Sequence, residues 1–104
     1  MLLLLLSAIS IRAQHTYVVS VGIADYQYIN DLTYTEADVN TFNQIMAQHN
    51  AEITTLTGAQ ASHADVIKTV RSVFAKATSL DAVIFFFSGH GYEGGFCCYD
   101  MKPN

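Results

Sequence analysis

The sequence predicts an α/β fold in three layers, with a mainly parallel central sheet and helices on both of its faces. The clearest observation is the apolar run Ala82–Phe87, which is rich in β-branched and aromatic residues and too short for a helix. Such a run is typical of a strand buried on both faces, and therefore in the middle of a sheet. The second observation is that strand-like and helix-like segments alternate along the chain, which requires right-handed crossovers between parallel strands.

The first half of the chain contains two of the predicted strands and one helix. Tyr17–Ile23 is β-branched and almost entirely apolar, which predicts a central strand. Thr35 and Asp38 then predict a helix start, with Thr35 as N-cap and Asp38 at position N3, and apolar residues recur every three or four positions after them. Glu52–Thr57 is short and more polar, and so predicts a strand nearer the sheet edge.

A second helix is predicted to begin after Ser62. Ser62 and Asp65 repeat the capping arrangement, and a broad apolar face follows that comprises Val66, Ile67, Val70, Val73, Phe74 and Ala77. Phe96–Asp100 predicts a further short strand. Three central strands and two helices leave a doubly wound sheet unfinished at its C-terminal side, so we expect an incomplete domain.

Composition limits the classes of partner. The chain has 104 residues, of which 51% are hydrophobic, and a single proline, which predicts one small globular domain with a real core. Nine acidic residues face five basic ones, the net charge is −4, and the basic residues form no cluster. We therefore expect no binding to nucleic acid or to an anionic membrane.

The N-terminus is an apolar run from Leu2 to Ile11, followed by the small residue Ala13. This pattern predicts a signal peptide over residues 1–13, and hence export to the periplasm or the medium. A stable membrane span is not expected, because about 20 apolar residues are needed to cross a bilayer. The alternative is that the run forms a buried first strand or helix of the fold.

The segment Ser88–Gly91 directly follows the predicted central strand. Its two glycines, Gly89 and Gly91, allow the backbone to turn sharply, so that His90 is held at the carboxyl end of the strand. Ligands bind at this edge of open α/β sheets. His90 is therefore a candidate general base and acid; the alternative is a histidine in a glycine-rich surface turn.

Three separated motifs give the chain a family resemblance. They are the Phe-rich strand that leads into Ser88–Gly91, the Val-rich strand that ends in Gly22–Tyr26, and the segment Leu32–Val39. In this order and context they resemble the caspase-like cysteine peptidases, over roughly residues 16–100, with the closest match to the bacterial metacaspase-like branch. The resemblance implies a caspase-like fold and hydrolysis of peptide bonds in peptide or protein substrates by a Cys–His dyad.

The resemblance also assigns roles to three residues. It implies that His90 is the dyad histidine, and that the backbone N–H of Gly91 helps to bind the developing oxyanion. Asp38 falls on a carboxylate that in metacaspases helps the specificity pocket to hold a Lys or Arg side chain. Metacaspases usually carry Gly-Cys and Asn just before this aspartate, whereas Tyr34–Ala37 stand here. A helix-capping role for Asp38 is the alternative, and the two roles are compatible.

The nucleophile does not follow from the sequence. In the caspase pattern the cysteine lies about 50 residues after the histidine, whereas fourteen residues follow His90 here. Cys97 and Cys98 are too close to His90 for that role, and as sequence neighbours they form no disulfide framework. We expect them to pack as small hydrophobic residues in a short hairpin strand, with a substitute nucleophile as the alternative.

Residues 14–104 are thus expected to be the N-terminal portion of a caspase-like peptidase domain, truncated before its nucleophile and inactive alone. The alternative is a catalytically inactive binding or regulatory module, or a gene fragment. No cofactor is expected, while a calcium requirement and the oligomeric state stay open. No metal site is predicted, because adjacent cysteines lack the spacing of a zinc motif.

Overall fold

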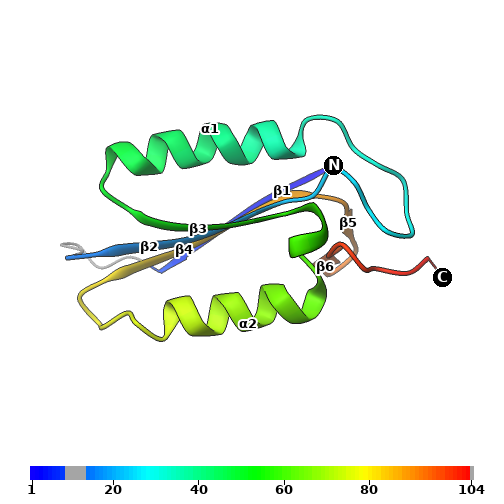
Figure 1. The fold of residues 1–104 in the computed structure, drawn as a ribbon. Helices are drawn as coiled ribbons and strands as arrows, with labels where there is room; N and C mark the ends of the chain where they lie inside the picture. Colours follow the sequence, from blue (N-terminus) through cyan, green and yellow to red (C-terminus); the bar gives the residue numbers. More distant parts are fainter. Residues whose placement is uncertain (9–13, 104) are drawn as a thin grey trace.

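The computed structural model describes residues 1–8 and 14–103. Four strands form the main sheet in the order β1-β4-β2-β3. They are β1 (Leu2–Ala8), β2 (Thr16–Gly22), β3 (Glu52–Thr57) and β4 (Ala82–Gly89). Helix α1 (Thr35–Gln48) covers one face of this sheet and α2 (His63–Phe74) covers the other, as Figure 1 shows. The predicted three-layer α/β architecture is confirmed.

Strands β2, β3 and β4 are parallel, as the alternation of strands and helices predicted. In register, Val18 of β2 pairs with Ile53 of β3 and with Ile84 of β4. Strand β4 has a neighbour on each side and its Phe87 is completely buried, which agrees with the central position predicted from its apolar run. Strand β3 lies at one sheet edge, also as predicted.

The apolar N-terminal run forms the opposite edge of the sheet. Strand β1 pairs antiparallel with β4, from Leu2 opposite Gly89 to Ala8 opposite Val83. Leu2 and Leu4 pack against the core, whereas Leu3, Leu5 and Leu6 are each more than half exposed. The structure thus contains the first strand that the sequence left open as an alternative. Cleavage after Ala13 stays a prediction, and residues 9–13 lie outside the described part of the chain.

The predicted N-cap of the first helix was wrong by one residue. Tyr34 occupies the cap without a side-chain cap hydrogen bond, and Thr35 is already helical. Thr35 is completely buried, and its carbonyl oxygen lies 3.1 Å from the position that a Cβ on Gly22 would take. This close packing of the helix start on β2 overrides the capping preference of Thr35. Among the described residues its Oγ1 has no hydrogen-bond partner.

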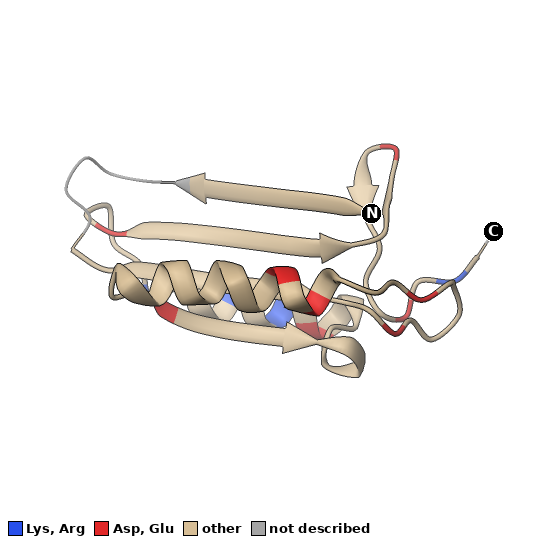
Figure 2. Ribbon diagram, turned by 90° about the horizontal axis from the view of Figure 1, so that it is seen from above, with Lys and Arg blue, Asp and Glu red and all other residues tan. Residues whose placement is uncertain are grey.

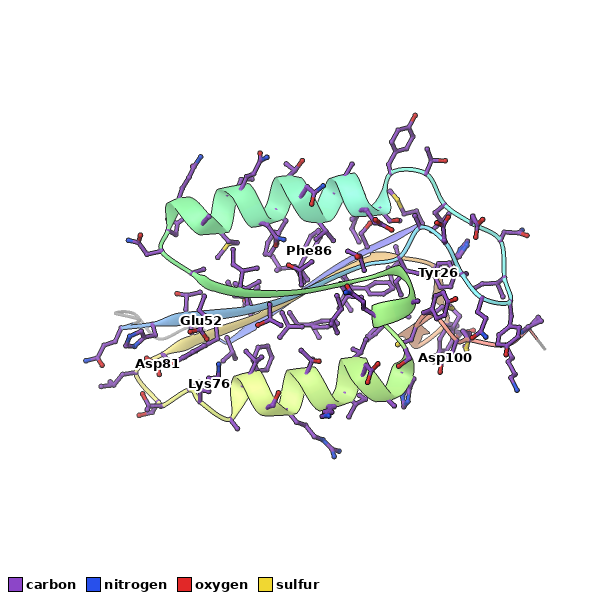
Figure 3. All side chains as sticks on the ribbon, viewed as in Figure 1. Tyr26, Glu52, Lys76, Asp81, Phe86 and Asp100 are labelled. Atoms are coloured by element: carbon purple, nitrogen blue, oxygen red, sulfur yellow. The ribbon has the colours of Figure 1, made fainter. Side chains whose placement is uncertain are left out.

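Packing fixes both helices on the sheet. The rings of Phe42 in α1 and Phe86 in β4 stack with their centroids 4.2 Å apart, as can be followed in Figure 3 for Phe86. In α2, Val66 and Val73 are buried in the core, and Val70 and Phe74 pack against it, so most of the predicted apolar face meets the sheet. Ile67 of that face is 39% exposed, and Ala77 lies beyond the end of the helix. The predicted cap of this helix is confirmed, because the Ser62 hydroxyl accepts a hydrogen bond from the backbone N–H of Asp65 at 3.2 Å.

After β4 the chain makes a small hairpin of β5 (Gly91–Tyr92) and β6 (Gly95–Phe96). The predicted strand Phe96–Asp100 is therefore wrong beyond its first residue. The backbone N–H groups of Cys97 and Tyr99 bond the carbonyls of His90 and Ala61, at 2.8 and 2.9 Å, instead of continuing a ladder. Within residues 1–8 and 14–103, no helix is long and apolar enough to cross a membrane.

Candidate functional site

His90 lies at the carboxyl end of β4, where the sequence predicted it. Its ring atom Nε2 is 2.7 Å from the backbone carbonyl oxygen of Asn30, in the loop that follows β2. Because a carbonyl oxygen only accepts hydrogen bonds, Nε2 carries a hydrogen, and in the neutral imidazole the lone pair is then on Nδ1. The half-buried imidazole is thus oriented to take up a proton at Nδ1.

Tyr26 contacts His90 from the same loop. The His90 N–H donates to Tyr26 Oη at 2.8 Å, and the Tyr26 hydroxyl donates to the Cys97 carbonyl at 2.9 Å. The two rings lie 5.0 Å apart between centroids. Burial, the largest of several influences, raises the pKa of Tyr26 to about 12, so the phenol stays protonated at neutral pH.

Asp38 reaches the end of β4 through Ser88. The buried Ser88 hydroxyl donates a hydrogen bond of 2.9 Å to Asp38 Oδ2, from strand to helix. Asp38 and His90 therefore belong to one end of the sheet, although no hydrogen bond that the described residues make joins them directly. The carboxylate is held where helix α1 begins, at a partly exposed position. A cationic side chain bound at this end would have Asp38 to pair with.

Gly91 follows His90 and lies against β1. A Cβ on Gly91 would come within 2.7 Å of Leu2 Cδ2 and 2.9 Å of Leu2 Cβ. Glycine is therefore required here by the close approach of the Leu2 side chain. The first residue of β1 thus covers the residue that the family resemblance assigns to oxyanion binding.

The two cysteines are buried in the core cluster, at 6% and 7% exposure. Burial raises the pKa of both thiols, that of Cys98 from 9.0 to about 11 with a smaller contribution from the nearby Asp100 carboxylate. The thiolate is the nucleophilic form, and little of it exists at neutral pH with such a pKa. These properties favour the predicted packing role over a substitute nucleophile, although the cysteines follow the hairpin strand and do not lie in it.

The charge at this end of the molecule is acidic. Segments at the carboxyl ends of the parallel strands carry seven of the nine acidic residues: Asp25, Asp31, Glu36, Asp38, Asp65, Glu93 and Asp100. Figure 2 shows acidic residues in red at the start of α1 and in the loops beside it, and Figure 3 labels Glu52 and Asp81 at the opposite end. A positive charge also lies beside these loops, since Lys102 Nζ is 5.7 Å from the centroid of the Tyr28 ring. This end should therefore attract a cationic ligand.

Within the described ranges, no group of three His, Cys, Asp or Glu side chains is placed to hold a metal ion. His15 Nδ1 lies 3.6 Å from Asp81 Oδ1, at the far end of the sheet. The backbone N–H of His63 donates a hydrogen bond of 2.9 Å to Asp100 Oδ1.

Sequence reasoning missed the roles of Tyr26, Asn30 and Ser88. Their partners are between 50 and 64 residues away in the chain, so no local periodicity reveals them. Tyr26 and Ser88 do fall within the motifs that carried the family resemblance. That membership was the one available signal.

Comparison with protein families gives a match to the model of the caspase domain over residues 15–103. The match includes β2 and every later element, and β1 lies outside it. No curated protein and no solved structure was found that matches the chain.

Proposed function

Since the chain belongs to the caspase domain family, which points to cysteine peptidase activity on protein substrates, we propose that it supplies the histidine of a metacaspase-like endopeptidase. The observation that carries this proposal is the hydrogen bond between His90 Nε2 and the Asn30 carbonyl. It supports the proposal because it favours the Nε2–H tautomer, in which the neutral imidazole would use Nδ1 to exchange a proton with a cysteine thiol.

In the proposed reaction, His90 Nδ1 takes the proton of a cysteine thiol other than Cys97 or Cys98. The thiolate attacks the scissile carbonyl carbon, and the negative charge moves to the carbonyl oxygen, near the Gly91 N–H. The C–N bond then breaks, while His90 returns its proton to the leaving amine. Water, deprotonated by His90, hydrolyses the resulting thioester and regenerates the thiol. The nucleophile is proposed to come from sequence downstream of this chain.

We further propose that the enzyme cleaves after Lys or Arg. Asp38 offers a carboxylate already hydrogen-bonded to Ser88, and the surrounding loops add acidic charge. A basic side chain would be paired at this end, whereas an acidic one would be repelled. We also propose that the leader over residues 1–13 is removed on export, and β1 with it, so that the exported protein begins at Gln14 and Leu2 no longer covers Gly91.

Substitution in an extended protein tests the proposed chemistry. This chain, refolded with the downstream segment of its own gene or of a close relative, should cleave basic peptides, and His90→Ala should reduce the rate by about 10³-fold or more. The paired Cys97→Ser/Cys98→Ser variant should keep most of the activity, while the unextended chain should have none.

The opposite results identify the alternatives. If the unextended chain cleaves peptides and loses that activity on either serine substitution, the dyad is local and our assignment of these thiols is wrong. If the extended, folded protein cleaves no peptide at all, the family scaffold serves here as a binding or regulatory module.

A further inference from the structure

The Tyr26 hydroxyl is enclosed between two backbone groups that are adjacent in space but seven residues apart in the chain. It accepts from the His90 N–H at 2.8 Å and donates to the Cys97 carbonyl at 2.9 Å. The Cys97 N–H in turn donates to the His90 carbonyl at 2.8 Å. Both backbone polar groups of His90 are therefore bonded, one by Tyr26 and one by Cys97.

The Tyr26 hydroxyl is closely packed against the backbone of Gly89. Tyr26 is 8% exposed, and a Cβ on Gly89 would come within 2.5 Å of its Oη. The residue before His90 must therefore be glycine for the hydroxyl to reach the His90 N–H. Gly89 is the last residue of β4, and this contact, which the sequence analysis did not predict, is what leaves no space for a Cβ there.

The same loop also holds the ring of His90. The Tyr26 N–H donates to Asp31 Oδ1 at 3.0 Å, and the Leu32 N–H donates to the Ala24 carbonyl at 2.8 Å. These two bonds close the loop on itself and place the Asn30 carbonyl against His90 Nε2. One loop therefore fixes the backbone of His90 through Tyr26 and its imidazole through Asn30.

We infer that Tyr26 is a positioning residue for His90, acting through its hydroxyl, and that the loop Ala24–Leu32 sets where the imidazole lies. This inference deepens the proposed function and rests on it. The Tyr26 hydroxyl bonds only backbone groups, the His90 N–H and the Cys97 carbonyl, so its effect on the imidazole is indirect.

Two substitutions in the complete chain separate the two parts of this arrangement. Tyr26→Phe keeps the ring and removes the hydroxyl, which leaves the His90 N–H without its acceptor. Asp31→Ala keeps the hydroxyl and frees the Tyr26 N–H, which loosens the loop that carries the Asn30 carbonyl. Tyr34→Phe is the matched control, because the Tyr34 side chain is 70% exposed.

Nuclear magnetic resonance measures both effects without any enzymatic activity. In Tyr26→Phe, hydrogen exchange at the His90 amide should be about tenfold faster or more, because a buried donor has lost its partner. In Asp31→Ala, the ring ¹⁵N signals of His90 should move from the Nε2–H pattern towards a mixture of tautomers. In Tyr34→Phe neither should change.

The inference is wrong if His90 amide exchange and ring signals are the same in Tyr26→Phe and in the native chain while its melting temperature falls, since Tyr26 would then be ordinary core. If Tyr26→Phe does not fold, an unchanged tautomer pattern in Asp31→Ala overturns the inference by itself. In an extended, active enzyme, Tyr26→Phe should lower kcat with KM unchanged. If the extended protein with its native sequence has no activity at all, that result would count against the proposed function. The nuclear magnetic resonance result for His90 would still hold.

Discussion

The two neighbours of β4 meet its carboxyl end in different ways. On the β2 side, Tyr26, Asn30 and Asp38 make directional hydrogen bonds to His90 and Ser88. On the β1 side, Leu2 pairs with Gly89 in the sheet, and its side chain covers Gly91 by apolar contact. Hydrogen bonds fix an orientation and a tautomer, whereas apolar contact fixes only that water is excluded. The β2 side is thus built to position a group, and the β1 side is built to cover one.

Removal of β1 should give the largest effect and tests the covering role. A chain that begins at Gln14 loses the packing of Leu2 and Leu4, each worth about 1.5–3 kcal/mol at most. We expect the free energy of unfolding to fall by several kcal/mol, as measured by urea denaturation, while the His90 resonances stay in place. The control is Leu3→Ser/Leu5→Ser, whose side chains are exposed, with a change of about 0.5 kcal/mol.

Two outcomes would contradict the role of β1 as a cover that does not position His90. If the shortened chain and the control have the same free energy of unfolding, the packing of β1 on the core contributes no measurable stability. A shift of the His90 ring signals on removal of β1 would mean that this side also positions the imidazole.

The next largest effect concerns Cys98, which lies in the segment that follows the hairpin of β5 and β6. With its pKa raised from 9.0 to about 11, its thiolate fraction at pH 8 is about 100-fold below that of an ordinary thiol. Iodoacetamide should therefore label Cys98 about 100-fold more slowly in the folded chain than in urea. Peptide mass mapping separates it from Cys97, and rapid labelling in the fold would indicate an activated thiol.

The same shifts set the direction of a pH effect on stability. The Tyr26 phenol and the Cys98 thiol have raised pKa values in the fold, so the folded state binds more protons than the unfolded state above about pH 9. The stabilisation is complete below that pH and is lost as the pH rises towards 11 and 12. Urea midpoints at pH 8 and pH 10.5 should show this fall, and a rising midpoint would contradict the burial of these groups.

The smallest effect, on selectivity, belongs to Asp38. In an extended, active enzyme, Asp38→Asn should lower kcat/KM for peptides with Lys or Arg before the scissile bond by about 10- to 100-fold. Glu36→Gln removes a charge from the same turn of α1 and is the matched control. A peptide library measures both, and equal cleavage after Asp would remove Asp38 from the specificity pocket.

The sequence was sufficient where the physical cause is local. The apolar run of β4, the period of the two helices and the cap at Ser62 depend on neighbours a few residues away, and all were predicted. The cap at Thr35 failed because a contact with β2, more than ten residues earlier, decides it. The hydroxyl of Tyr26 and the carbonyl of Asn30 reach His90 only after the sheet has formed. The position of His90 was therefore predictable, but the groups that orient it were not.

The pairing of β1 with β4 has a consequence for the order of events during synthesis. Leu2 and its partner Gly89 are 87 positions apart in the chain, so the pair cannot form until the chain has been synthesised beyond residue 89. At about 5–20 residues per second, the N-terminal run stays unpaired for several seconds after it leaves the ribosome. If the run acts as the proposed leader, it would be accessible to export machinery during this interval as an unpaired apolar segment. Once β4 has been made, the run can pair with it as β1 and is then less accessible.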